Sequence, residues 1–183
     1  MEDRLILVDL LDVPVGEAGK LEAHQKSLLH RAFSVFLYRG DEMLIQKRAA
    51  GKYHSAGLWA NTCCSHPRVG EHLEEAVSRR LWEEVRIRYE MENLHHLTSF
   101  VYREDFGELA EYELDHVFVG RYDGPFTPDP EEIGEMKWVK LDALAEELRC
   151  FPQRFSEQTA DVKGNSCGYF DSSFTDRADH RAH

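Results

Sequence analysis

Residues 71–88 read EHLEEAVSRRLWEEVRIR and combine a high density of charge with apolar side chains at helical spacing. The apolar positions are Ala76, Val77, Leu81 and Val85. Because residues three or four apart share one face of a helix, the segment predicts an amphipathic α-helix. Before it, Arg31–Tyr38 alternates and is rich in β-forming residues, and Arg39–Glu42 predicts a turn into Met43–Arg48. A β-hairpin therefore precedes the helix.

Shorter apolar runs lie on both sides of these elements. They predict strands at Arg4–Val8, Leu58–Cys63, Leu97–Tyr102, Glu111–Val119 and Glu135–Lys140, a loop or short helix at Gly19–Leu29, and a helix at Leu141–Leu148. Strands at both ends and a long helix between them indicate an α+β (mixed α/β) sandwich, with a mixed β-sheet core flanked by helices. No repeat or linker divides the 183 residues, so we expect one domain over residues 1–170 and a mobile tail at 171–183.

The composition limits the possible ligands. The chain has 34 Asp+Glu against 22 Lys+Arg, a formal net charge of -12, and 42% hydrophobic residues. The hydrophobic share argues against a disordered chain, and the acidic excess argues against a nucleic-acid partner. An anionic ligand would have to be bound by a few placed Lys or Arg side chains.

The N-terminal sequence and the cysteines indicate the compartment. The N-terminus is acidic, and its apolar run is too short for a signal peptide or a membrane span. The four cysteines fit neither a C-x-x-C motif nor a secreted disulfide framework. They are Cys63, Cys64, Cys150 and Cys167. We therefore expect a cytoplasmic protein without a membrane partner.

The segment NTCCSHP, residues 61–67, concentrates reactive side chains. In an extended chain the period of two places Cys64 and His66 on one face and Cys63 on the other. The alternative is that both cysteines are small core residues.

A second group of polar residues consists of imidazoles and carboxylates. His24 and His30 are six residues apart and would not share a helix face, but His24 could fold back beside His30 if a strand begins there. Glu111 and Glu113 project from one face of a strand, where they need water or a cation. The alternatives are partly exposed histidines and a solvated acidic face. With His66, this set suits Mn, Zn, Fe or Mg better than a thiolate zinc site.

On the predicted helix, Arg79 and Glu83, and likewise Arg80 and Glu84, are four residues apart and therefore neighbours. These pairs are either ordinary surface ion pairs or part of a site. In a site, Glu84 would hold Mg²⁺ and Arg80 would meet a phosphate oxygen, since Mg²⁺ prefers one or two carboxylates plus substrate phosphates.

Several motifs resemble one family. Ser65, Glu71, Arg79, Leu81, Glu83 and Glu84 follow the spacing of a degenerate Nudix box, in which Ser65, Arg80 and Arg86 occupy the places that usually hold Gly, Glu and Gly. Together with HRAFSVFLY, NTCCSHP, RRLWEE and EYELDHVF, this pattern resembles type I isopentenyl-diphosphate isomerases from about Lys20 to Trp138. The resemblance implies a Nudix-like fold and an isomerase that interconverts isopentenyl and dimethylallyl diphosphate through a carbocation-like intermediate, in isoprenoid biosynthesis.

The resemblance also implies a role for individual residues. The catalytic residues would be Cys64 and Glu113, with Tyr102 beside Glu113. The ligands of one divalent ion, Mn²⁺, Zn²⁺ or Mg²⁺, would be His24, His30, His66, Glu111 and Glu113. Glu84 would hold the Mg²⁺ that accompanies the diphosphate. The diphosphate contacts would be Lys20, Arg48, Lys52 and Arg80.

The reaction needs two acid/base groups on opposite faces of the substrate. Our hypothesis is that Glu113, aided by Tyr102, delivers the first proton and Cys64 takes the second. Family members place a Trp near the C-terminus against the reacting carbons, whereas the segment here offers only Phe151 and Phe155. The alternative functions are hydrolysis of a nucleoside diphosphate derivative by a Nudix hydrolase and non-enzymatic metal binding by an interaction module. We expect a monomer whose partner is a small diphosphate.

Overall fold

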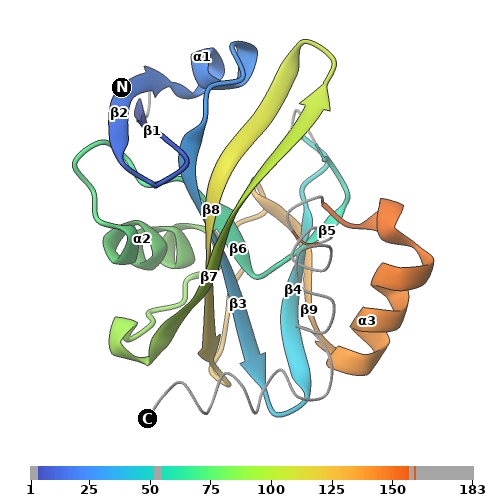
Figure 1. The fold of residues 1–183 in the computed structure, drawn as a ribbon. Helices are drawn as coiled ribbons and strands as arrows, with labels where there is room; N and C mark the ends of the chain where they lie inside the picture. Colours follow the sequence, from blue (N-terminus) through green and yellow to red (C-terminus); the bar gives the residue numbers. More distant parts are fainter. Residues whose placement is uncertain (1–3, 52–54, 157–158, 160–183) are drawn as a thin grey trace.

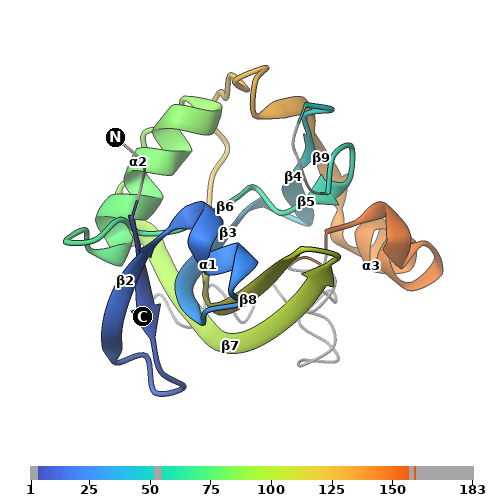
Figure 2. The ribbon, with the colours of Figure 1, turned by 90° about the horizontal axis from the view of Figure 1, so that it is seen from above.

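The computed structural model describes residues 4–51, 55–156 and 159 of the chain (Figure 1). A curled mixed β-sheet has helix α2 (Leu73–Val85) on one side and helix α3 (Leu141–Cys150) on the other, as the view from above shows (Figure 2). This arrangement confirms the predicted α+β sandwich. The remaining helices are α1 (Lys20–Gln25) and the short 3₁₀ helices η1 (Met91–Asn93) and η2 (Pro152–Arg154). The strands are β1 (Arg4–Val8), β2 (Pro14–Gly19), β3 (His30–Arg39), β4 (Glu42–Arg48), β5 (Trp59–Ala60), β6 (Cys63–Ser65), β7 (Leu94–Phe106), β8 (Leu109–Arg121) and β9 (Ile133–Lys140).

Strand β3 lies at the centre of the sheet. It runs parallel to β8, with His30 opposite Glu113 and Tyr38 opposite Arg121, and antiparallel to β1, β4 and β6. Strands β7 and β8 form a long antiparallel pair, and β9 joins the sheet beside β4. Residues that are far apart in the sequence therefore meet along β3.

The side chains of β3 alternate between two hydrophobic cores. Phe33, Val35 and Leu37 pack in the core that includes the apolar face of α2. Phe36 and Tyr38 pack in the core that includes α3. This is the alternation expected of a strand with both faces buried.

The strand predicted at Leu58–Cys63 is wrong as a single element, because two polar residues interrupt it. Asn61 and Thr62 lie between β5 and β6 and are fully buried. The Asn61 side-chain amide donates to the backbone oxygens of Val35, at 3.2 Å, and Cys63, at 2.7 Å. Side-chain hydrogen bonds take the place of some backbone hydrogen bonds between strands at this point. The hydrophobic pattern of the sequence therefore does not reveal that the strand is interrupted.

Thr62 connects two strands that separate. Strands β3 and β4 pair only near their shared turn, and β6 pairs with β3 further along. The Thr62 hydroxyl accepts a hydrogen bond from the Leu37 backbone N–H at 2.9 Å and donates one to the Leu44 backbone oxygen at 2.7 Å. It therefore bridges the gap between β3 and β4 immediately before the NTCCSHP cysteines.

Two further elements differ from expectation. Strand β2 was not predicted, because Pro14–Gly19 lacks β-forming alternation and is extended through its pairing with β1. Helix α2 is shorter than residues 71–88 and ends where Arg86 adopts a left-handed conformation, with φ 57° and ψ 27°. The expected tail at 171–183 lies outside the described residues. No helix in the described part of the chain is both long enough and apolar enough to span a bilayer.

Candidate active site

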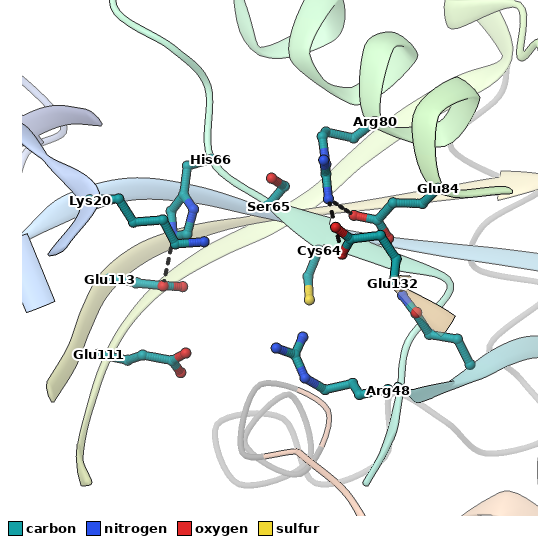
Figure 3. Close-up of a pocket in the computed structure, with 11 residues that line it drawn as sticks. Lys20, Arg48, Cys64, Ser65, His66, Arg80, Glu84, Glu111, Glu113 and Glu132 are labelled. Atoms are coloured by element: carbon teal, nitrogen blue, oxygen red, sulfur yellow. Dashed lines mark hydrogen bonds and ion pairs between the residues drawn. The ribbon is translucent and has the colours of Figure 1, made fainter. Parts of the chain in front are cut away.

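A cleft of about 570 Å³, including space open to solvent, gathers most of the residues singled out by the sequence. Its two ends differ (Figure 3). One end holds Lys20 from α1, His66 after β6, and Glu111 and Glu113 from β8, and the other holds Arg48 from β4, Arg80 and Glu84 from α2, and Glu132 before β9. The lining residues are Lys20, Gln46, Arg48, Cys64, Ser65, His66, Arg80, Glu84, Glu111, Glu113 and Glu132.

Four predicted metal ligands converge at one end of the cleft. His24 from α1, His30 from β3, His66 after β6 and Glu113 from β8 each offer one donor atom, and these atoms lie within 4.8 Å of one another. The expectation that His24 lies beside His30 is confirmed, with ring centroids 5.2 Å apart. His24 and His30 are 2% and 0% exposed, so the alternative of partly exposed histidines is wrong.

The strand pairing orients this group. The β3–β8 register sets His30 opposite Glu113. His30 donates its Nδ1–H to the Leu28 backbone oxygen at 2.8 Å, which leaves Nε2 3.5 Å from Glu113 Oε1. His66 Nε2 lies 2.9 Å from the same oxygen. Ring nitrogens therefore face one carboxylate oxygen.

The protonation states of this group suit a metal. Burial lowers the pKa of His24 to about 3 and that of His66 to about 4, so both imidazoles are neutral near pH 7. Burial of Glu113 opposes ionisation, but the neighbouring His66 and His30 outweigh it and hold the pKa of the carboxyl well below its usual range. Neutral imidazole nitrogens and an ionised carboxylate are donors for a divalent transition metal.

Tyr102 joins Glu113 to the other predicted carboxylate ligand. Its hydroxyl lies 2.6 Å from Glu113 Oε2, to which it donates, and 3.2 Å from Glu111 Oε2. Both glutamates are buried, so the alternative of a solvated acidic face is wrong. Burial and the Glu113 charge raise the pKa of Glu111 to about 8. Glu111 is not among the four converging ligands, and it adjoins them through Tyr102.

The two adjacent cysteines have different surroundings. Cys63 is fully buried in the core against α2, whereas Cys64 points the opposite way and lines the cleft with His66. The predicted division of faces is confirmed, and the core-residue alternative holds for Cys63 only. Burial raises the pKa of the Cys64 thiol to about 12, while the charge of Arg48 acts in the opposite direction.

Both predicted helix pairs form, and Glu83 lies 3.1 Å from the guanidinium groups of both Arg79 and Arg80. Arg79 binds both oxygens of Glu71, at 2.7 and 2.9 Å, and lies 3.5 Å from the His66 backbone oxygen, so it ties the His66 loop to the helix. Arg80 pairs with Glu84 inside the cleft. Because Glu84 is only 4% exposed, the surface-pair alternative does not apply to it. Burial raises the pKa of Glu84, and Arg80 opposes that rise.

Comparisons with known proteins agree with this geometry. A model of the NUDIX domain matches residues 28–159. The chain is 49% identical over 158 residues to isopentenyl-diphosphate Delta-isomerase 2 of Aromatoleum aromaticum, covering 85% of this chain and 82% of that protein. It is 50% identical over 143 residues to isopentenyl-diphosphate Delta-isomerase 2 of Photorhabdus laumondii, covering 77% and 79%.

The chain belongs to the isopentenyl-diphosphate Delta-isomerase family. Solved structures of more distant proteins share the fold of this chain. A Deinococcus radiodurans protein aligns with a TM-score of 0.69 over 87% of this chain and 96% of its own, at 20% identity. A MutT protein of Methanosarcina mazei aligns with a TM-score of 0.54 at 20% identity, covering 84% and 94%. At this identity the likeness concerns the fold alone.

The remaining predicted residues of this isomerase-family chain have the following positions. Lys20, Arg48 and Arg80 line the cleft, and Lys52 lies outside the described residues. Phe151 is 48% exposed and Phe155 is buried in the α3 core, and neither is among the residues that line the described cleft.

The structure adds residues that the sequence reasoning missed. Gln46 donates from its side-chain amide to the Thr62 backbone oxygen at 3.1 Å and lies 3.5 Å from Glu84 Oε2. Asp115 is buried and accepts a hydrogen bond from the Ser34 hydroxyl at 2.8 Å. Asp115 continues the alternation of Glu111 and Glu113, which was a usable signal, whereas nothing in the sequence singles out Gln46 or Glu132.

Proposed function

We propose that this protein interconverts isopentenyl diphosphate and dimethylallyl diphosphate. The observation that carries the proposal is that Cys64 and Glu113 line one cleft whose far end holds Arg48 and Arg80. In Figure 3, Cys64 lies between the Glu111 and Glu113 side of the cleft and the side formed by Arg48 and Arg80. Membership of the isomerase family supports the same reaction.

The isomerisation consists of two proton transfers. A proton adds to the terminal methylene carbon, which becomes a methyl group, and a tertiary carbocation-like centre forms beside it. Loss of a proton from the carbon on the other side of that centre forms the new double bond. One proton is gained and one is lost, so the substrate and product have the same composition, and two positioned acid/base groups suffice.

We propose that the Glu113–Tyr102 pair delivers the first proton, through the Tyr102 hydroxyl because Glu113 itself is ionised, and that Cys64 removes the second. The short contact from the Tyr102 hydroxyl to Glu113 Oε2, 2.6 Å, supports a shared proton donor on that side. Burial raises the pKa of the Cys64 thiol to about 12, so the thiolate is the minor form near neutral pH. The Arg48 charge favours the thiolate and would support Cys64 as the base.

This order of proton transfer has a pH signature. The thiolate fraction rises tenfold per pH unit below the thiol pKa, so kcat/KM should rise from about pH 7 to about pH 9. A kcat/KM that stays flat or falls over this range would contradict Cys64 as the base. As a second test, Cys64→Ala should still exchange solvent deuterium into the substrate methylene group while losing net isomerisation, and loss of all exchange would contradict the order.

We propose that the His/Glu group binds one divalent metal, Mn²⁺, Zn²⁺ or Mg²⁺, with Glu111 as a further ligand. The donor set fits, because the imidazoles of His24, His30 and His66 converge with an ionised carboxylate. When bound, the metal supplies positive charge that allows Glu111 and Glu113 to be ionised together. Burial and mutual repulsion otherwise keep Glu111 protonated near neutral pH.

We propose that the other end of the cleft holds the diphosphate. The cations there are Arg48 and Arg80, while Lys20 faces the cleft from the His66 and Glu113 side (Figure 3) and Lys52 is included from the sequence. Glu84 would hold the Mg²⁺ that accompanies the substrate, since Mg²⁺ combines few carboxylates with phosphate oxygens. Binding of the diphosphate at this end orients the five-carbon tail toward Cys64 and Glu113.

The direct test is a proton NMR time course with isopentenyl diphosphate, Mg²⁺ and metallated protein. The second methyl signal of dimethylallyl diphosphate should appear. Cys64→Ala should abolish it, and Cys150→Ala is the control because the same atoms are removed from an exposed cysteine that does not line the described cleft. If the metallated protein produces neither that signal nor deuterium exchange, the proposed function is wrong.

The same samples test the alternatives. A Nudix hydrolase would release phosphate or nucleotide from a nucleoside diphosphate derivative, and we expect no such release. A purely structural metal module would unfold on metal removal and would not bind diphosphate in its metallated form. We also propose a cytoplasmic monomer, for which size-exclusion chromatography should give the mass of one chain.

A further inference from the structure

Glu132 lines the cleft although no motif includes it. It lies in the loop before β9, and this loop is attached to the elements that carry the diphosphate-binding residues. The Asp129 backbone N–H donates to the Glu84 backbone oxygen at 2.7 Å, at the end of α2. The Ala49 backbone N–H donates to the Glu132 backbone oxygen at 3.0 Å, at the end of β4. Glu132 is therefore held between α2 and β4.

The side chain of Glu132 shares Arg80 with Glu84. The Arg80 Nη2 atom pairs with Glu84 Oε1 and lies 3.7 Å from Glu132 Oε2. Figure 3 shows Arg80 extending from α2 toward both carboxylates. Their environments differ, because the Glu84 side chain is 5% exposed and that of Glu132 is 33% exposed. Glu84 is the deep acceptor and Glu132 is the one at the mouth of the cleft.

A cation at Glu84 would change this arrangement. A cation on the Glu84 carboxylate would compete with Arg80 for it, because two positive groups on one buried carboxylate repel each other. The Nη1 atom of Arg80 keeps Glu83, whose Oε2 lies at 3.1 Å, but the Nη2 atom that Glu84 gives up needs another acceptor. Glu132 is already within 3.7 Å of the same guanidinium nitrogen, so the guanidinium needs only a small shift to pair with it.

We propose that Glu132 is a positioning residue that retains Arg80 in the cleft when Mg²⁺ engages Glu84, and thereby makes Mg²⁺ and diphosphate binding cooperative. The inference rests on the proposed roles of Glu84 and Arg80 in holding Mg²⁺ and diphosphate. Glu83 is 39% exposed and holds Nη1 alone, so without an acceptor at Nη2 the guanidinium would lose the preorganisation that planar recognition of phosphate requires. Glu132 prevents that loss.

The test uses inorganic pyrophosphate as the probe and the full chain as the protein. Calorimetric affinity for pyrophosphate is measured without Mg²⁺ and at saturating Mg²⁺ for the unmodified protein, Glu132→Gln and Glu131→Gln. Glu131 is the matched control, because it is exposed and the same charge is removed one residue away. Comparing variants cancels the complex that Mg²⁺ and pyrophosphate form in solution.

In Glu132→Gln, the gain in pyrophosphate affinity caused by Mg²⁺ should shrink by at least about fivefold, the lower end of typical couplings between sites. Without Mg²⁺, its affinity should equal or exceed that of the unmodified protein, because Glu132 no longer competes for Arg80. Glu131→Gln should behave as the unmodified protein. Equal Mg²⁺ effects in Glu132→Gln and Glu131→Gln would overturn the proposal.

A double-mutant cycle tests whether Glu132 acts through Arg80 or contacts Mg²⁺ directly. If Glu132 acts through Arg80, adding Glu132→Gln to Arg80→Gln should not reduce the Mg²⁺ effect further. A full additional loss would mean that Glu132 contacts Mg²⁺ itself, and the positioning role would be wrong. Glu132→Asp, which keeps the charge, should restore part of the coupling if Glu132→Gln folds poorly. These binding measurements need no turnover, so failure of isomerisation would be seen separately.

Discussion

Thr62→Val tests whether one hydroxyl joins the separated strands β3 and β4. Valine has nearly the same shape as threonine, so the change removes the hydroxyl without opening a cavity. The Leu37 backbone N–H, at 2.9 Å from the hydroxyl oxygen, and the Leu44 backbone oxygen, at 2.7 Å, both lose their side-chain partner. Thr62 is 0% exposed, so water does not easily replace it.

The expected loss of stability is large. Leaving a buried donor or acceptor without a partner costs about 1–3 kcal/mol, so two such groups cost about 4 kcal/mol together. Because whole domains have unfolding free energies of about 5–15 kcal/mol, this is a substantial fraction of the total. Thr62→Ser is the matched control, since it keeps the hydroxyl and removes one methyl group at a cost of about 1 kcal/mol.

Urea denaturation followed by far-UV circular dichroism measures the free energy of unfolding and the m-value of each variant. We expect Thr62→Val to be several kcal/mol less stable than Thr62→Ser, with an unchanged m-value. A Thr62→Val protein as stable as Thr62→Ser would refute the reasoning, because the hydroxyl would then not support the two backbone groups.

Three further predictions concern other parts of the molecule. Relative to His24→Gln, the unmodified metal-free protein should lose free energy of unfolding as the pH drops from about 6.5 toward about 4, because His24 has a lowered pKa and binds a proton only after unfolding. Comparing the two proteins cancels the opposite contribution of Glu111 and Asp115, whose pKa values are raised to about 8, and a difference in urea midpoints that stays constant over this range would contradict the prediction. Arg86→Ala should lower the free energy of unfolding by about 1–2 kcal/mol, because alanine must adopt the same left-handed conformation without the guanidinium bonds to the Trp82 and Glu83 backbone oxygens. Arg86→Gly should be about 1 kcal/mol more stable than Arg86→Ala, and thermal melts with equal midpoints for the two variants would argue against this. Glu71→Gln should weaken divalent-metal binding about tenfold, because Arg79 loses its carboxylate partner and no longer holds the His66 backbone in place. An unchanged metal affinity in a chelator competition would show that Arg79 does not position His66.

Local patterns in the sequence determined most of the elements. The alternation in β3 and the helical spacing in α2 predicted elements that the structure contains, since burial of one face imposes a period of two on a strand and of about 3.6 on a helix. The period of two also placed Cys64 toward the cleft and Cys63 toward α2. These inferences depend only on neighbours in the chain.

Tertiary structure alone decided how distant segments meet. The register of β3 and β8 sets His30 opposite Glu113, and α1 returns His24 to the same point. Asn61 and Thr62 interrupt a predicted strand because their partners are backbone groups on β3, β4 and β6, which no local pattern reveals.

Glu132 entered the cleft for a similar reason. Its loop is attached to the end of α2 and the end of β4 by backbone hydrogen bonds, which carry no sequence signature. The sequence by itself thus determined which side chains face a common surface within each element and, through its motifs, the family. The tertiary structure decided which of these surfaces meet, because register, strand separation and loop attachment depend on contacts between residues far apart in the chain.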